Sequence, residues 1–260
     1  MRADGSAIPG LFAAGEVIEI RKEFKEDRQE GPFGEINNDH FNIFVDATEG
    51  PDTESYSRWV MTGTFKISTS PQLRETIYHP GAVPLKEPRP CSGYITTFNP
   101  FGRGHIIIKV GECTCCECYV SDFEKSPKIS DNLLAKSGVL NNVKVGEVPI
   151  NSATFMVKYM LTVQQMSLSR EAFDFFKLIK IQKEQASNIF QPTSGELIGN
   201  IKAVNSETRV VGLFWATAIN EKVAFIQRED VPYGIPAFPV VEESCLLAFD
   251  HSTTEKPEAW

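Results

Sequence analysis

The chain has few histidines, no dense basic cluster and no long apolar run, and each of these shortages excludes a class of protein. Only four histidines occur among 260 residues, and none lies at metal-ligand spacing from another. No stretch approaches the roughly 18 consecutive apolar residues that a transmembrane helix needs. The formal charge is −8, whereas phosphate binding requires a basic surface. We therefore expect neither a nucleic-acid partner nor a membrane-spanning helix.

Catalytic signatures are also missing. The sequence contains no GxSxG elbow, no HExxH, no Walker A loop and no GxGxxG. Residues 5–17 resemble a segment found late in flavoproteins of the fumarate reductase type, but the residues that follow lack its glycine-rich continuation. We therefore expect no enzyme, with no catalytic residues, no metal site and no cofactor.

The beginning of the chain lacks the basic start and long apolar run of a signal peptide. Apolar residues make up 42% of the sequence and charged residues 23%, which is typical of a globular protein that can bury a core.

A predicted helix carries a row of three lysines, Lys177, Lys180 and Lys183. We interpret this row as a solvated face of the helix.

Alternation of apolar and polar side chains is the main structural signal, and it favours β-strands. It is clearest in residues 41–47 and 55–69, the latter interrupted only by Gly63. HIIIKV, residues 105–110, predicts a compact buried strand. Residues 197–204 and 210–219 predict a hairpin joined by the turn residues 205–208. Further strands are predicted near residues 16–20, from residue 141, and over 154–163 and 223–227.

One helix is predicted, over about 169–187, because residues 170–186 contain no Gly or Pro and follow two possible N-caps, Ser167 and Ser169. Its apolar stripe is expected at Phe175, Leu178, Ile179, Gln182 and Ala186. A Pro-rich stretch, residues 71–100, predicts a long loop. The predicted fold is therefore mainly β: a sandwich-like antiparallel domain with one long α-helix and long Pro-rich loops.

The polar, Gly/Asn-rich residues 30–40 predict a joint in the chain. We therefore expect residues 1–37 to be an N-terminal segment or the remnant of a preceding domain, and residues 38–260 to form a single β-rich domain.

The cysteines carry the strongest chemical signal. Four of the six lie in the run CTCCEC, at Cys113, Cys115, Cys116 and Cys118, and Cys91 and Cys245 lie elsewhere. This spacing is also used by thiolate clusters that bind soft metals. If the segment is extended, Cys113 and Cys115 lie on one face of the strand and Cys116 and Cys118 lie on the other. The four thiolates then cannot bind the same tetrahedral metal ion. Disulfides are the favoured interpretation, with Cys91 and the four cysteines of the run as candidates, while reduced thiols and a metal stay open. Disulfides would place the chain in an oxidising, exported location.

Several segments carry a resemblance to a known family. They are FNIFVDATEGPDTESYSRWVMTGTFKI, CTCCECYVSDFEKSPKISDNLL and FMVKYMLTVQQMSLSREAFDFFKLIKIQKEQASNIFQPTSGELIGNI, with VVGLFWATAI close behind. In this order and spacing, residues 41–227 resemble a large family of Bacteroidota surface lipoproteins known as a domain of unknown function.

The resemblance implies an exported outer-membrane or cell-surface protein with a lipid-anchored N-terminal cysteine and an Ig-like domain, both absent from this chain. It further implies a TonB-dependent outer-membrane transporter as partner. The protein would contact the membrane only through its lipid anchor. The expected function is therefore that of a non-catalytic accessory or binding protein of such a transporter. The alternatives are a structural spacer without ligand, or a metal-binding or enzymatic protein that uses the CTCCEC cluster.

Overall fold

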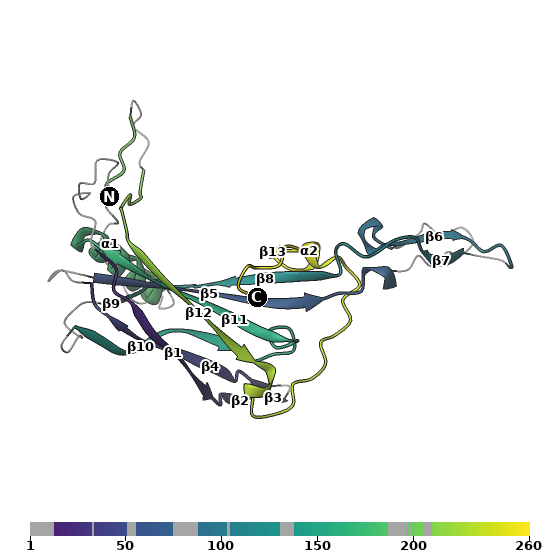
Figure 1. Cartoon of the computed structure of the whole chain (residues 1–260), viewed down its shortest axis with the longest axis horizontal. Helices are drawn as coiled ribbons and strands as arrows, with labels where there is room; N and C mark the ends of the chain where they lie inside the picture. Colours follow the sequence, from purple (N-terminus) through teal and green to yellow (C-terminus); the bar gives the residue numbers. More distant parts are fainter. Residues whose placement is uncertain are drawn as a thin grey trace. The chain divides into compact units, whose positions relative to one another are not determined.

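A computed structural model of the chain describes residues 13–32, 34–50, 56–74, 88–102, 105–130, 138–186, 197, 199–204 and 210–260 (Figure 1). Within these residues the protein is mainly β, with several antiparallel sheets, one long helix and one short helix. This arrangement is consistent with a β-sandwich, and the predicted fold class is confirmed.

The strands and helices follow one another along the chain in this order. They are β1 (Val17–Lys25), β2 (Arg28–Gly31), β3 (Gly34–Asn37), β4 (His40–Thr48), β5 (Tyr56–Ser68), η1 (Pro71–Leu73), η2 (Pro90–Ser92), β6 (Tyr94–Phe98), β7 (His105–Lys109), β8 (Glu117–Phe123), β9 (Lys128–Ser130), β10 (Val139–Pro149), β11 (Lys158–Leu168), α1 (Arg170–Ala186), β12 (Ile219–Gln227), η4 (Arg228–Asp230), α2 (Cys245–Ala248) and β13 (Ser252–Thr253). In the largest sheet the strand order is β12-β11-β5-β8-β13, and β9 also pairs with β5. The smaller sheets are β1-β4-β10, β2-β3 and β6-β7.

The chain divides into two compact units. The first contains the described residues of Met1–Thr62, Phe123–Val148 and Thr162–Ala224. The second contains those of Gly63–Asp122, Pro149–Leu161 and Phe225–Trp260. The expected boundary near residue 37 stays a prediction.

In the first unit, apolar and polar side chains alternate along β4, so the strand has one apolar face. Phe41, Ile43 and Val45 are at most 3% exposed, as the sequence predicts, and β4 pairs antiparallel with β1. The amide of the buried Gln165 on β11 donates to the Thr48 carbonyl oxygen at 3.0 Å. This bond links the end of β4 to a strand of another sheet within the same unit.

Helix α1 has the predicted bounds, and the Ser169 hydroxyl accepts a hydrogen bond from the Ala172 amide at 3.3 Å. The predicted stripe is displaced by about one residue, because Ala172, Phe173 and Phe176 are the buried side chains. Phe175 and Ile179 pack only at the edge of this cluster. The helix contains three phenylalanines within four positions, so more than one face could have provided the aromatic contact. Of the predicted solvated lysines, Lys177 and Lys183 are exposed and Lys180 is half-buried.

Glycine 63 does not interrupt β5, which runs continuously through it. A Cβ atom added at Gly63 would lie 1.7 Å from the Tyr159 hydroxyl oxygen, so this position accommodates a neighbouring aromatic side chain. Tyr159 is fully buried and stacks on Phe65 with ring centroids 5.9 Å apart. Burial raises the pKa of the Tyr159 phenol well above its ordinary value, so the ring stays neutral.

Residues 30–40, where a joint is expected, overlap the paired strands β2 and β3, and the joint itself stays a prediction. Two other local predictions need correction. The strand expected from Thr154 begins at Lys158 instead. The Asn151 side-chain oxygen accepts hydrogen bonds from the Ala153 and Thr154 amides, each at 2.9 Å. These bonds form a turn where the strand was expected to begin. Proline-rich residues 71–100 are not all loop, since β6 lies within them; residues 75–87 fall outside the described part.

The predicted hairpin of residues 197–204 and 210–219 is wrong as a pair of strands. In the described residues of these segments, strand structure begins only at Ile219. The Asn200 side chain instead bonds both backbone groups of Phe214, donating to the carbonyl at 2.6 Å and accepting from the amide at 2.7 Å. A side chain therefore replaces the backbone ladder here, and the predicted turn, residues 205–208, lies outside the described residues.

Candidate functional site

All six cysteines lie in the second unit, where they form three disulfides. Cys91 bonds to Cys115 and Cys113 to Cys116, with Cα atoms 5.6 and 5.7 Å apart. Cys118 of β8 bonds to Cys245, the first residue of α2, with Cα atoms 5.9 Å apart. These separations suit a disulfide without backbone displacement. The predicted disulfide framework is confirmed, and it indicates an oxidising, exported environment.

Backbone hydrogen bonds hold the cysteine segments beside one another. The Cys245 amide donates to the Cys115 carbonyl at 3.1 Å, and the Thr69 amide donates to the Cys116 carbonyl at 2.7 Å. The Thr114 amide donates to the Cys91 carbonyl at 2.8 Å. Four segments therefore meet at this cluster: the end of β5, η2, the CTCCEC run and α2.

Two details of the sequence interpretation are wrong. The run is not extended before β8, and residues 114–116 form a bend, which lets Cys113 reach Cys116. The sixth cysteine, Cys245, is not among the five predicted candidates, yet it bonds to Cys118. A simple signal could have found it, because five disulfide candidates cannot all pair with one another and Cys245 is the remaining cysteine in the sequence.

The paired sulfurs bear on the metal alternative. In this oxidised form none of the six cysteines is a free thiol, and metal-binding cysteine requires the thiolate. Among the residues that the structure describes, no group of three or more His, Cys, Asp or Glu side chains is arranged to hold a metal ion. One of the four histidines, His79, lies outside the described residues and is not covered by this finding.

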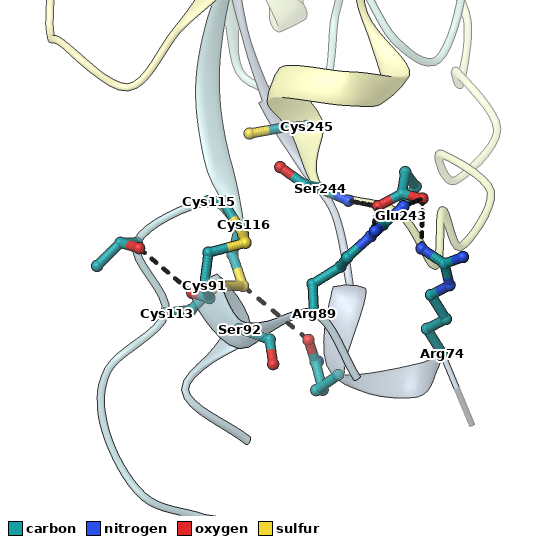
Figure 2. Close-up of a disulfide and its surroundings, with 12 residues drawn as sticks. Arg74, Arg89, Cys91, Ser92, Cys113, Cys115, Cys116, Glu243, Ser244 and Cys245 are labelled. Atoms are coloured by element: carbon teal, nitrogen blue, oxygen red, sulfur yellow. Dashed lines mark hydrogen bonds and ion pairs between the residues drawn. A yellow bond between two sulfur atoms is a disulfide. The ribbon is translucent and has the colours of Figure 1, made fainter. Parts of the chain in front are cut away.

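A charged cluster lies next to the disulfides (Figure 2). Glu243 accepts hydrogen bonds from the Arg89 guanidinium at 2.6 and 2.7 Å and from Arg74 at 2.8 Å. The bond from Arg89 is the main cause that lowers the pKa of Glu243 from 4.5 to about 2, against a smaller opposing effect of burial. The Glu243 carboxylate, just before α2, therefore binds both Arg74, which precedes residues 75–87, and Arg89, which follows them.

This ion cluster predicts a pH-dependent stability. We expect Glu243→Gln to lower the free energy of unfolding by about 1 kcal/mol near neutral pH, since the Glu243 side chain is 30% exposed and partly screened. The folded-state pKa is lowered, so the contribution is complete above about pH 4.5 and is lost as the pH falls through about 2. Urea unfolding of both proteins across this range measures the difference.

The control for this experiment is Glu258→Gln, which removes an exposed carboxylate elsewhere in the second unit. It should change stability by less than about 0.5 kcal/mol. A Glu243→Gln deficit that stays constant down to about pH 2 would contradict the role of the ionised carboxylate.

A shallow, open hollow of about 380 Å³ adjoins the ion cluster. It is lined by Arg74, Val240, Val241, Glu242 and Glu243. Val240 is 68% exposed at this surface, and Ser70 donates its backbone amide to the Val241 carbonyl at 2.8 Å. The hollow therefore combines an exposed apolar side chain with charged groups that already have partners.

The disulfides also fix the base of a two-stranded ribbon made of β6 and β7. In the described part of the second unit these strands pair only with each other, and the ribbon extends away from β8 and β13 (Figure 1). At its base, Gly93 has φ +74° and its carbonyl accepts the Val110 amide at 2.8 Å. A Cβ at Gly93 would lie 2.4 Å from the Gly111 carbonyl oxygen, so both conformation and space require glycine.

The strand predicted over residues 105–110 is present as β7, but its predicted burial is wrong. Ile108 is 38% and Val110 is 59% exposed. A run of isoleucines predicts a strand but cannot show what covers it, and this strand has β6 as its only partner in the described residues.

No helix among the described residues is both long and apolar enough to cross a membrane. No curated protein and no solved structure matches the chain. A family model described as "Domain of unknown function (DUF4249)" matches residues 7–223. This match covers most of the sequence, and the chain belongs to this family.

Proposed function

We propose that this chain is a non-catalytic protein of the bacterial cell surface that binds a TonB-dependent outer-membrane transporter. The observation that carries the proposal is the three-disulfide cluster, since it indicates an exported protein and fixes a surface of the second unit. The transporter as partner comes from the resemblance to Bacteroidota surface lipoproteins.

The contact is proposed at the end of the second unit that carries the disulfides. Arg74 and Arg89 both donate to the Glu243 carboxylate there, so these charged groups already have partners. The exposed Val240 at the hollow supplies apolar surface beside a framework whose backbone is held by disulfides. A pre-organised surface of this kind loses little conformational entropy on binding.

Co-purification tests this proposal. The chain would be exported in a Bacteroidota host with a leader and a lipid anchor added, and isolated from detergent-solubilised membranes. We expect an outer-membrane β-barrel to be recovered with it. Val240→Asp should reduce the recovered barrel at least about fivefold, because a carboxylate at a desolvated contact is costly.

The matched control is Val204→Asp, which places the same charge at a valine of the first unit that is 83% exposed. This variant should recover as much barrel as the parent chain. Recovery of no barrel by the parent, under conditions where known lipoprotein partners recover theirs, would contradict the proposal and favour the spacer alternative. A stoichiometric metal bound to the parent would favour the metal-binding alternative.

A further inference from the structure

We infer that the disulfide between Cys113 and Cys116 is a thiol-exchange site, which an external dithiol reduces while the rest of the chain stays folded. This inference rests on the cysteines and their surroundings and not on the proposed transporter partner.

Accessibility separates this disulfide from the other two. Cys113 and Cys116 are both half-buried. Each of the other disulfides contains a buried cysteine, since Cys115 is 1% exposed and Cys118 and Cys245 are fully buried. Thiol exchange requires a thiolate to reach one of the two bonded sulfurs. Because neither of its cysteines is buried, the Cys113–Cys116 disulfide is the most accessible of the three.

The fold also depends less on this disulfide than on the other two. It spans three positions of sequence, whereas the others span 24 and 127, and a short loop restricts the unfolded chain least. The bend that it closes is held by other bonds. Cys115 is joined to Cys91, and the Cys116 carbonyl accepts the Thr69 amide at 2.7 Å. Reduction therefore leaves Cys113 and Cys116 beside each other, in position to bond again.

A hydrogen-bond acceptor that the disulfide cannot use lies beside Cys116. The Oε1 atom of Gln72, in η1, is 4.0 Å from the Cys116 sulfur. A disulfide sulfur carries no proton, whereas a thiol is a weak donor. This contact therefore becomes a hydrogen bond only in the reduced form, and the site accommodates both oxidation states.

The carboxylates on either side of the cysteines already have partners. Glu112 pairs with Lys109 and Glu117 pairs with Lys66, each at 2.8 Å. An attacking thiolate is negatively charged and would be repelled by an unpaired carboxylate. The two lysines reduce this repulsion.

The exchange is a two-electron reduction of the disulfide. One thiolate of the dithiol attacks the Cys113 sulfur, whose chain neighbours Glu112 and Thr114 are exposed. A mixed disulfide forms, the Cys113–Cys116 bond breaks, and Cys116 leaves as a thiolate that takes a proton from water and donates it to Gln72. The second thiolate of the dithiol then attacks its own sulfur in the mixed disulfide, so Cys113 leaves and is protonated. The dithiol ends as a disulfide and the protein gains two thiols.

Timed blocking of thiols tests the inference. The purified, oxidised chain would be treated with dithiothreitol without denaturant, blocked at intervals with a thiol reagent and mapped by mass spectrometry. We expect Cys113 and Cys116 to be blocked at least about tenfold faster than Cys118 and Cys245. Circular dichroism should show the selectively reduced chain folded, and oxidised glutathione should restore the same pair.

Three results would overturn the inference. The first is blocking of Cys118 and Cys245 as fast as Cys113 and Cys116. The second is loss of the fold when only Cys113 and Cys116 are reduced. The third is resistance of this pair to dithiothreitol until the chain is unfolded.

Gln72→Leu tests the acceptor. In a buffer of reduced and oxidised dithiothreitol, we expect this variant to shift the Cys113–Cys116 equilibrium toward the disulfide at least about twofold, because only the reduced form loses a hydrogen bond. The matched control is Gln164→Leu, which removes a half-buried glutamine of the first unit that bonds to Glu221. It should leave the equilibrium unchanged. Equal shifts in the two variants, or none in Gln72→Leu, would overturn the role of Gln72 at this site.

These measurements use the chain without membranes, so they are independent of the transporter. If the pair were reduced selectively but no barrel were recovered in the co-purification, the proposed function would fail and the exchange site would stand. If a barrel were recovered but the pair resisted dithiothreitol, the exchange site would be wrong and the proposed function would stand.

Discussion

We expect the double variant Cys118→Ala/Cys245→Ala to lose about 3–5 kcal/mol of unfolding free energy relative to the parent chain. Its disulfide spans 127 positions of sequence, which makes it the most restrictive of the three on the unfolded chain. Both sulfurs are fully buried, so their removal also leaves unfilled space. Removing both cysteines avoids a free thiol that could pair wrongly.

The folded state gives a second reason for a large effect. The described residues between η4 and α2, residues 231–244, form no helix or strand. They are held by contacts such as the Arg228 guanidinium, which donates to the carbonyls of Phe155 at 2.8 Å and Ile235 at 2.9 Å. Without the disulfide, this C-terminal segment is still held by such bonds, by the ion cluster at Glu243 and by the packing of Trp260 on Tyr119, but no covalent bond joins it to β8.

Cys113→Ala/Cys116→Ala is the matched control, since its disulfide spans only three positions. Loop-closure entropy then predicts a loss of about 2 kcal/mol or less. Urea unfolding of the three oxidised proteins gives the comparison. Equal losses in the two double variants would show that loop closure does not determine the stabilisation.

The second large effect concerns helix α1. We expect Phe176→Ala to lower the free energy of unfolding by about 3–5 kcal/mol, because its ring is 6% exposed and its removal leaves a cavity. The ring packs edge-on against Trp215 with centroids 5.0 Å apart. The Arg58 guanidinium carbon lies 4.5 Å from the same ring centroid. The substitution removes one aromatic contact of each group.

Phe175→Ala distinguishes the observed buried face from the predicted one. Its ring is partly buried at the edge of the same cluster, so its loss should cost about 1–2 kcal/mol. Lys177→Ala, an exposed position on the same helix, should stay within about 0.5 kcal/mol. Thermal or urea unfolding of the three variants measures these values. A larger loss for Phe175→Ala than for Phe176→Ala would restore the stripe predicted from the sequence.

The sequence predicted best where a side-chain period extended over many residues. The alternation of β4 and β5 and the bounds of α1 follow directly from such periods. It failed where one side chain decides the local conformation, as at Asn151 and Asn200. In those places a side-chain oxygen bonds backbone groups that a strand would otherwise use.

The candidate site was only partly predictable for a different reason. The CTCCEC run identifies a dense group of cysteines, but pairing depends on which segments meet in space. Cys245 lies 127 positions from its partner, and Glu243 reaches Arg74 and Arg89 across more than 150 positions. The exposure of the β6–β7 ribbon likewise depends on the absence of a third strand beside it among the described residues, and no local pattern carries that information.

Mapping the disulfides of the exported protein tests the central claim most directly. The chain would be recovered from an exported location, blocked with a thiol reagent under denaturing conditions, digested without reduction and examined by mass spectrometry. We predict no blocked cysteine and three linked pairs: Cys91–Cys115, Cys113–Cys116 and Cys118–Cys245. Six blocked cysteines, or one soft metal ion per chain released on denaturation, would contradict the account of an exported protein held by a disulfide cluster.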